Sequence, residues 1–376
     1  MPFIVPTMLR ASLTKFRHAC LRPLLAAGLL WACAAASTQA QNLPAAAAVP
    51  APALKLHIVG GLAGLNQYLR NEEPFWSREL ARMSNGKYSA VIVPFDRAGV
   101  PGGDMLRLLQ LGVVPFGTVL QSSLLAQYPQ YAATDLAGLS HDMTTLKKVV
   151  AAYRPYLEHD LRTQHKVVML ALYVYPAQVL FCKNAFRQLA DLKGRRIRVA
   201  SSSQSDFFTA LGAQPVMTGF AQIMENMASG NTECAVTGAM SGNTLGLHEV
   251  TGYIHTLPIS WGLAVFGANQ GAWDNLPPDL RALLSHELPK LEAAIWTESE
   301  RETAEGLQCN TDVGLCRLGR KGQMTPVVAT AADEQFRRTI FSNTVLPKWL
   351  ARCGPVCADL WQQTIGKVTG IEAKAP

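Results

Sequence analysis

DLKGRRIRVASSSQSDFFTALGAQPVMTGFAQIMENMASGNTE, residues 191–233, is the most informative stretch of the chain. Residues 191–194 are typical of a turn, and the alternating residues 196–200 predict a short strand. A helix is expected to open at Asp206 and to stop at Gly212, because glycine commonly ends helices. The close succession of strand and helix predicts an α/β fold.

The predicted strand carries an arginine, Arg198, near its end. An arginine in a short buried strand is costly unless an anion pairs with it, and its planar guanidinium can hold a carboxylate by two parallel hydrogen bonds. Ser201 and Ser202 follow directly, so their hydroxyl and backbone N–H groups can converge on the same anion. The alternative is an ion pair between Arg198 and an Asp or Glu of its own lobe.

Strands and helices alternate on both sides of this stretch, which indicates parallel sheets with helices on both faces. Two α/β lobes follow from this pattern. The first lobe is expected at residues 54–173, completed by about 262–300, and the second at 174–261, completed by about 300–365. Strands are predicted at 54–59, 88–94, 113–119, 167–175 and 233–236, and helices at 66–83, 105–111 and 220–228.

Residues 277–307 hold the longest helical pattern of the chain. A continuous helix of this length is about 45 Å long at 1.5 Å per residue, so it can span both lobes. Pro289 lies inside the pattern and is expected to kink or split the helix. The alternative is two consecutive helices packed on one lobe.

The N-terminal region is typical of a secretory signal peptide. A basic stretch precedes the apolar run 23–36, which is too short to cross a bilayer, where about 20 apolar residues are needed. Residues 1–40 are therefore expected to be a signal peptide and 41–53 a flexible Ala/Pro-rich leader. The formal charge of +7 includes four basic residues of this signal. The remaining chain is near neutral, which gives no case for nucleic-acid binding.

Six of the eight cysteines follow the predicted signal. Cys309 with Cys316, and Cys353 with Cys357, are close enough to form local disulfides in an oxidising compartment. Neither pair has CxxC spacing or a neighbouring histidine, so no metal site is expected. The chain also lacks the P-loop, GxSxG and HExxH motifs. We therefore expect no enzymatic activity and no cofactor.

The stretch resembles the solute-binding proteins of tripartite ATP-independent periplasmic (TRAP) transporters, the DctP-type family. Members share a DLKG turn, a KIRV-like strand, an LGA-x-PV segment and a later glycine turn. These elements match residues 191–194, 197–199, 211–216 and 230–234. The match is specific in this block, and its pattern continues loosely from Leu54 to Trp349.

The resemblance implies a two-lobed, type II-like periplasmic binding-protein fold with a long helix across both lobes. It implies a monomeric periplasmic protein that closes around a small organic acid and delivers it to a membrane permease. The family's carboxylate-binding arginine corresponds to Arg198, and a further ligand-binding position corresponds to Thr237 with Gly238. A second arginine of the family has no clear counterpart, and Gln178 lies nearest, with Lys183 as a basic candidate. This departure favours a ligand with one carboxylate and an apolar or aromatic body.

Further candidate residues come from the loops after the first-lobe strands. Ligands of open α/β sheets lie beyond the carboxyl ends of the strands. Asn66 and Thr118 are the main candidates from these loops, and Trp261 could stack on a ligand from the second lobe. The same argument nominates Gly61, Leu62, Phe95, Asp96 and Gly117.

Two other functions remain compatible with the sequence. A binding module of this kind could signal to a membrane sensor instead of feeding a permease, and the same scaffold could carry a periplasmic enzyme. Neighbouring permease genes would favour transport, and a neighbouring sensor kinase would favour signalling.

The signal-peptide assignment predicts the start of the mature protein. Expressed with its export machinery, the chain should be cleaved after Ala40, whether translation begins at Met1 or Met8, so that intact-mass analysis finds Gln41 first. A protein that keeps the apolar run 23–36 would contradict the assignment.

Overall fold

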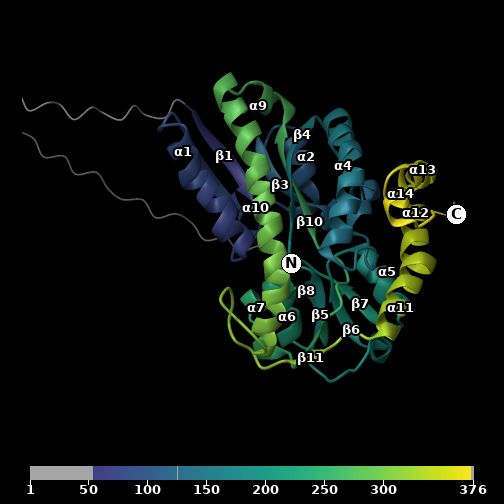
Figure 1. The fold of residues 1–376 in the computed structure, drawn as a ribbon. Coiled ribbons are helices and arrows are strands. Elements are labelled where there is room, and N and C mark those ends of the chain that lie inside the picture. The colour runs from purple at the N-terminus through teal and green to yellow at the C-terminus, as the bar shows by residue number, and fades with distance from the viewer. Residues whose placement is uncertain (1–53, 125, 374–376) are drawn as a thin grey trace, which may run out of the picture. The chain divides into compact units, whose positions relative to one another are not determined.

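A computed structural model describes residues 54–124 and 126–373, so the predicted signal peptide and the whole of the predicted leader lie outside the described residues. Two sheets organise this part of the chain (Figure 1). The first sheet has the order β2-β1-β3-β10-β4, and the part built on it is called the first lobe. Its strands are β1 (Leu54–Gly60), β2 (Tyr88–Pro94), β3 (Phe116–Leu120), β4 (Val167–Val174) and β10 (Leu263–Asn269).

The second sheet has the order β11-β9-β5-β8-β6-β7, and the part built on it is called the second lobe. The strand that carries Arg198 lies between β7 and β8, parallel to both. The strands of this sheet are β5 (Gln178–Cys182), β6 (Arg196–Val199), β7 (Gln214–Met217), β8 (Cys234–Gly238), β9 (Tyr253–His255) and β11 (Thr325–Val327).

Both sheets are mixed, whereas the alternation of the sequence predicted parallel sheets. β10 runs antiparallel to β3 and β4, and β5 runs antiparallel to β8 and β9. β4, β5, β9 and β10 are the strands joined by the segments that cross between the lobes. β5 and β10, which each directly follow one of these crossings, are the two strands that run against the others of their sheets.

The helices that follow the first strands start and end close to their predicted places. The predicted helix at 66–83 consists of η1 (Gln67–Glu72), η2 (Phe75–Glu79) and α1 (Leu80–Met83). The other first-lobe helices before β4 are α2 (Met105–Gln110), α3 (Gln121–Leu124), η5 (Pro129–Asp135) and α4 (Met143–His165), with short turns at η3 (Phe95–Arg97) and η4 (Gly102–Asp104).

The helix after β6 starts earlier than predicted. α5 (Ser202–Ala210) begins four residues before Asp206, and the hydroxyl of Ser201 accepts a hydrogen bond from the Gln204 N–H at 3.3 Å. A serine cap thus sets the start of this helix. The remaining second-lobe elements are η6 (Leu189–Leu192), η7 (Phe220–Gln222), α6 (Ile223–Ala228), α7 (Ala239–Leu245) and α8 (Leu247–Val250).

Two short segments carry the chain between the lobes side by side. Residues 175–177 join β4 to β5, and residues 256–262 join β9 to β10. The Gln178 N–H donates to the Ser260 carbonyl at 2.8 Å, the Ile259 N–H donates to the Gln178 carbonyl at 2.8 Å, and the Tyr175 N–H donates to the Gly262 carbonyl at 2.9 Å. These hydrogen bonds tie the two crossings into one narrow ribbon.

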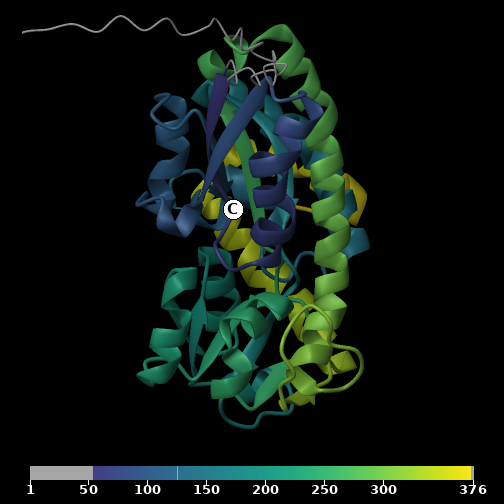
Figure 2. The ribbon, with the colours of Figure 1, turned by 90° about the vertical axis from the view of Figure 1, so that its left-hand side faces the viewer.

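α10 (Pro278–Thr311) is one continuous helix of 34 residues and runs along both lobes (Figure 2). In the first lobe the indole N–H of Trp296 donates to the Leu172 carbonyl at 2.8 Å. In the second lobe the Asn310 amide donates to the Ala239 carbonyl at 2.9 Å. Pro289 neither splits nor ends the helix. It lies on an exposed face, where water can satisfy the carbonyl that loses its N–H partner.

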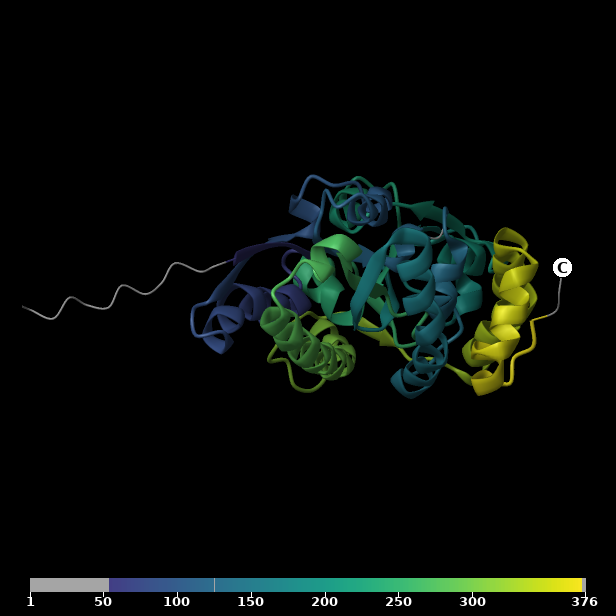
Figure 3. The ribbon, with the colours of Figure 1, turned by 90° about the horizontal axis from the view of Figure 1, so that it is seen from above.

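The C-terminal helices lie on the other side of α4 from α10 (Figures 1 and 3). α14 packs on α4, and α12 packs on η5, so both contact the first lobe, whereas α11 contacts η6 of the second. The bounds of this group and of the helix before α10 are α9 (Gln270–Asp274), α11 (Ala331–Ile340), η8 (Phe341–Val345), α12 (Leu346–Cys353), α13 (Pro355–Gln363) and α14 (Ile365–Thr369). None of the helices within the described ranges is long and apolar enough to span a membrane.

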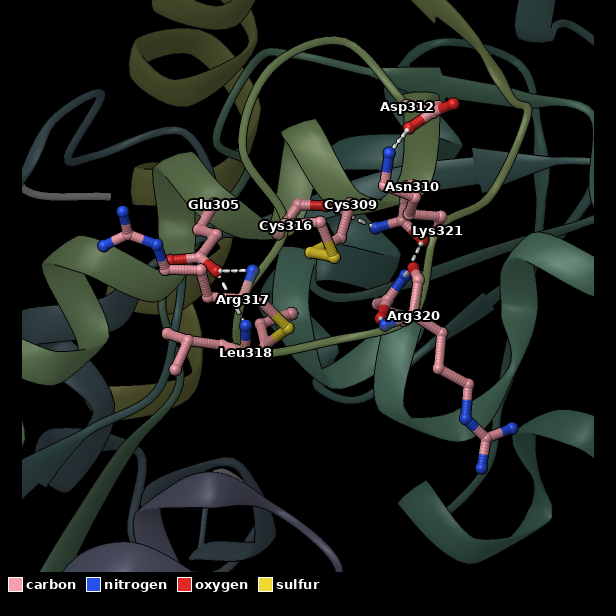
Figure 4. Close-up of a disulfide and its surroundings, with 12 residues drawn as sticks. Glu305, Cys309, Asn310, Asp312, Cys316, Arg317, Leu318, Arg320 and Lys321 are labelled. Carbon is pink, nitrogen blue, oxygen red and sulfur yellow. Dashed lines mark hydrogen bonds and ion pairs between the residues drawn. A yellow bond between two sulfur atoms is a disulfide. The ribbon is translucent and has the colours of Figure 1, made fainter.

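Three disulfides link the six described cysteines. Both of the short-range pairs expected from the sequence are present, Cys309–Cys316 and Cys353–Cys357. The first closes the loop after α10, where the Glu305 carboxylate also accepts the N–H groups of Arg317 and Leu318 (Figure 4). The third, Cys182–Cys234, joins directly opposed residues of β5 and β8. Its partners are 52 residues apart, so only the strand register reveals them.

The close contact of α10 with α7 predicts an unusual effect of a glycine substitution. A Cβ atom at Gly306 would lie 2.4 Å from the backbone nitrogen of Met240. Alanine normally stabilises a helix interior by about 1 kcal/mol over glycine. Gly306→Ala should instead lower the free energy of unfolding by about 1–3 kcal/mol, because the backbones must separate.

Chemical denaturation measures this effect. Ala304→Gly, at an exposed position of the same helix, is the matched control and should cost about 1 kcal/mol through helix propensity alone. A Gly306→Ala variant that is more stable than the wild type would show that α10 and α7 do not approach as described.

Candidate functional site

A cavity of about 650 Å³ lies between the two lobes. Its walls follow the carboxyl ends of β1, β2 and β3 in the first lobe and of β6, β7 and β8 in the second, which is where open α/β sheets place ligands. The lining residues are Leu62, Leu65, Phe95, Asp96, Gly102, Leu120, Ser122, Ser123, Tyr175, Gln178, Arg198, Ala200, Met217, Thr218, Gly219, Phe220, Ala221, Gln222, Thr237, Gly238, Ser241, Gly262 and Leu263.

Arg198 projects from β6 into this cavity, although only 2% of its surface is exposed. Its Nε and Nη2 donate to the Thr218 carbonyl at 3.1 and 2.6 Å, and its Nη1 donates to the Val236 carbonyl at 2.8 Å. A guanidinium has five N–H groups. One N–H on Nη1 and one on Nη2 therefore have no partner among the described residues.

Within the part of the chain that the structure describes, the positive charge of Arg198 has no counterion. No carboxylate of the described residues forms an ion pair with it, so the alternative of an own-lobe Asp or Glu partner is not observed. Burial lowers the pKa of the guanidinium to about 10, which still leaves it protonated at neutral pH. An unpaired buried cation with two open N–H groups has the charge and the donors to hold an anion.

The lining contains little other charge. Arg198 is the single basic residue and Asp96 the single acidic residue among the described residues that line the cavity. Asp96 is exposed, and its Oδ1 accepts the Ala63 N–H at 2.8 Å. Large apolar side chains make up much of the remainder, namely Leu62, Leu65, Phe95, Leu120, Met217, Phe220 and Leu263.

Four residues predicted from the sequence line the cavity, and they come from three neighbouring strands. Arg198 comes from β6, Thr237 and Gly238 end β8, and Gln178 begins β5, where it is the register partner of Gly238. Leu62, Phe95 and Asp96, nominated from the loops after β1 and β2, also line it.

The structure places seven other candidates outside the lining, among them Gly61 and Gly117 of the first-lobe strands. Ser201 caps α5, and Ser202 lies in the first turn of that helix. The indole of Trp261 is buried and donates to the Ser140 carbonyl at 3.0 Å. Asn66 donates to the Glu302 carboxylate of α10, and Thr118 is fully buried within β3.

Lys183 also lies away from the cavity, because its ammonium group donates to the Met227 carbonyl at the end of α6.

Several lining residues were not predicted from the sequence. Ser122 and Ser123 follow β3 and fit the rule that nominated the other loops, so the rule could have found them. Tyr175 lies in the crossing, and Phe220 and Gln222 lie in the turn after β7, where no pattern distinguishes them.

The crossing beside the cavity is held by a partly buried carboxylate. Asp135 accepts the N–H groups of Trp261 and Gly262 at 2.7 and 2.8 Å. Desolvation raises the pKa of Asp135 to about 6, although these two hydrogen bonds oppose the shift. Asp135 thus anchors the second crossing to the first lobe at the point where Gly262 meets the cavity.

A fully buried carboxylate, Glu72, supports the first-lobe wall. It accepts the Gly61 N–H at 2.8 Å and the Gln67 amide at 2.9 Å. Desolvation raises the pKa of Glu72 to about 7. The cavity-lining Tyr175 places its hydroxyl near Gly61, since a Cβ atom there would lie 3.1 Å from it.

The family model of DctP, bacterial extracellular solute-binding protein family 7, matches residues 64–313. A comparison with curated proteins finds no match. Among solved structures, the pyroglutamic acid-binding extracytoplasmic solute receptor DctP7 of Bordetella pertussis is 20% identical, with a TM-score of 0.72, over 83% of this chain and 99% of that one.

Two further solved structures have a similar fold. A TRAP periplasmic solute-binding protein from Desulfovibrio salexigens, with bound orotic acid, is 17% identical at a TM-score of 0.72, covering 84% of this chain and 99% of that one. Another from Shewanella oneidensis, with bound succinate, is 18% identical at a TM-score of 0.69, covering 83% and 98%. The similarity extends over both lobes, in agreement with the two-lobed fold and long helix expected from the sequence.

The raised pKa of Glu72 predicts a pH-dependent stability. Between its ordinary value of 4.5 and about 7, the folded chain keeps a proton that the unfolded chain has lost, so stability falls as the pH rises through this window. Glu72→Gln removes this penalty, and Gln67, whose Oε1 has no hydrogen-bond partner, can turn to accept from the new amide. At pH 8 the variant should be more stable by about 2 kcal/mol.

Denaturant titrations at pH 5 and pH 8 measure the difference. The variant should match the wild type at pH 5 and exceed it at pH 8. Glu73→Gln, at the neighbouring carboxylate with an exposed hydrogen bond to Ser77, is the control and should leave the pH profile unchanged. An equal loss of stability in Glu72→Gln at both pH values would contradict the account.

Proposed function

Because the chain belongs to the DctP family, family 7 of the bacterial extracellular solute-binding proteins, we propose that it is the periplasmic solute-binding subunit of a TRAP-type secondary transporter. In this role it captures a small organic carboxylate between its lobes and delivers it to the membrane permease. The family consists of solute-binding receptors, and the proposed role requires no covalent bond to be made or broken.

The observation that carries this proposal is the state of Arg198. A buried cation without a counterion is unfavourable, because desolvation is not offset by an ion pair. A ligand carboxylate that accepts from the open N–H groups on Nη1 and Nη2 supplies the missing charge and two hydrogen bonds. The site is therefore suited to bind an organic anion and to hold it in one orientation.

The composition of the cavity supports a ligand with one carboxylate. Arg198 is the single cation of its described lining, and Asp96 would repel a second anionic group that reached it. The apolar side chains of both lobes favour an apolar body. The solved structures of similar fold bind small organic acids with one carboxylate, such as pyroglutamic acid and orotic acid, and with two, as in succinate.

Lobe closure would couple binding to recognition by the permease. Residues from both lobes line the cavity, so a ligand that contacts both stabilises a closed form over an open one. The two crossings are short and lie side by side, as expected of a hinge in which a few residues change their backbone angles. α10 contacts both lobes beside this hinge.

Arg198→Ala tests the proposed function. The mature protein, refolded to remove carried ligand, is screened by thermal shift against mono- and dicarboxylates, aromatic acids, sugar acids and sulfonates. A ligand at a hundredfold excess over its Kd stabilises the folded wild type by about 2.7 kcal/mol. This stabilisation should disappear in Arg198→Ala.

Arg196→Ala is the matched control, because it removes the same charge from the same strand. The Arg196 side chain is exposed and donates to the carbonyls of Asn231 and Gly230 outside the cavity lining. The control variant should bind the same acid as the wild type. Equal stabilisation of wild type and Arg198→Ala would remove Arg198 from the site, and the absence of any stabilising acid in the panel would contradict organic-acid capture.

A further inference from the structure

Gln178 occupies the cavity wall beside Arg198, at the point where the chain enters the second lobe. It begins β5, pairs in register with Gly238, and its backbone bonds to both Ile259 and Ser260 of the other crossing. Its side chain lines the cavity. A neutral amide at this position can present either its oxygen or its NH₂ group to a ligand. The oxygen selects a hydrogen-bond donor of the ligand, and the NH₂ group selects an acceptor.

A chain of hydrogen bonds determines which face is presented. The Ala200 N–H, which can only donate, donates to Oε1 of Gln204 at 2.7 Å. The Gln204 amide must therefore turn its Nε2 the other way, and Nε2 donates to Oε1 of Gln178 at 2.9 Å and to the Ser260 hydroxyl at 2.8 Å. Gln204 is buried and does not line the cavity.

The Gln178 Oε1 thus accepts a hydrogen bond from Gln204, and the NH₂ group of Gln178 points away from Gln204. This nitrogen lies beside Gly262, which also lines the cavity, and a Cβ atom at Gly262 would approach it to 2.6 Å. The Gln178 Nε2 donates to no group within residues 54–124 and 126–373. Two donors from Arg198 and one amide donor therefore face the same cavity.

We propose that Gln204 is a positioning residue that fixes Gln178 as a hydrogen-bond donor, so that the site selects an acid with one carboxylate on Arg198 and an uncharged oxygen acceptor on Gln178. The proposal rests on the proposed function and names its ligand class. Suitable acceptors are the carbonyl or hydroxyl oxygens of lactam, oxo and hydroxy acids.

The charge of the site explains why the second group is uncharged. A neutral amide can donate a hydrogen bond to a second carboxylate, but it leaves the charge of that carboxylate uncompensated in a cavity with one cation. A carbonyl or hydroxyl oxygen accepts the same hydrogen bond without this cost. Such a site discriminates strongly between ligands. A buried polar group of the protein or of the ligand that is left without a hydrogen bond lowers the binding free energy.

Gln204→Glu and Gln204→Met separate positioning from a purely structural role. The carboxylate introduced by Gln204→Glu can still accept from Ala200, but it cannot donate, so Gln178 must turn its NH₂ group inward and present its oxygen to the ligand. The thioether introduced by Gln204→Met replaces none of the amide's hydrogen bonds and leaves the Gln178 amide free to rotate. Positioning predicts that Gln204→Glu weakens L-pyroglutamate binding roughly tenfold or more, and Gln204→Met by less. A structural role predicts the opposite order.

A double-mutant cycle removes the effect of the added charge. In a Gln178→Leu background, Gln204→Glu should change the affinity for L-pyroglutamate little, because the amide through which it acts is absent. An equal loss in both backgrounds would show a general charge effect and would overturn the proposal. Chemical denaturation without ligand shows whether each variant is folded.

The ligand class is tested on the wild type by calorimetry with L-pyroglutamate, orotate and succinate, with Arg198→Ala beside it. The proposal expects the first two to bind at least roughly tenfold more tightly than succinate. Tighter binding of succinate that depends on Arg198 would overturn the inference and leave the proposed function standing. Absence of binding by all three would overturn the inference, and binding unaffected by Arg198→Ala would overturn the proposed carboxylate site.

Discussion

The guanidinium of Arg198 is the constraint from which the rest of the site follows. It is enclosed by β6, β7 and β8, and backbone carbonyls of Thr218 and Val236 hold it in place without neutralising it. Carbonyl dipoles orient a cation and lower the cost of burying it, but they leave its charge available to a ligand. An internal carboxylate would have stabilised the empty protein and closed the site to anions.

The crossings between the lobes bring other cavity-lining groups close to this cation. Gln178, Gly262 and Tyr175 all lie in or beside the two crossing segments, so these segments form part of the cavity wall. A change in the geometry of the crossings would therefore alter the groups that line the cavity. The carboxylates of Asp135 and Glu72 hold the first-lobe side of this arrangement through backbone N–H groups.

Helices and strands were predicted well from the sequence where their bounds depend on neighbouring residues alone. The strand 88–94 was placed with its observed bounds, and Arg198 was identified because a charged residue in a buried strand requires an explanation. Residues whose role depends on distant contacts could not be placed. The Trp261 indole donates to the Ser140 carbonyl, and the Gln204 amide forms hydrogen bonds with Ala200, Gln178 and Ser260. The antiparallel strands likewise depend on the crossings, which leave no periodic signal.

A crystal structure of the protein with a bound organic acid tests the central claim most directly. We predict one ligand carboxylate with its two oxygens within about 3 Å of Nη1 and Nη2 of Arg198, in the cavity between the lobes. We also predict that the carbonyls of Thr218 and Val236 keep their hydrogen bonds to the guanidinium. An acid bound elsewhere, or a guanidinium paired with a carboxylate of its own chain, would contradict the claim that Arg198 is the ligand's counterion.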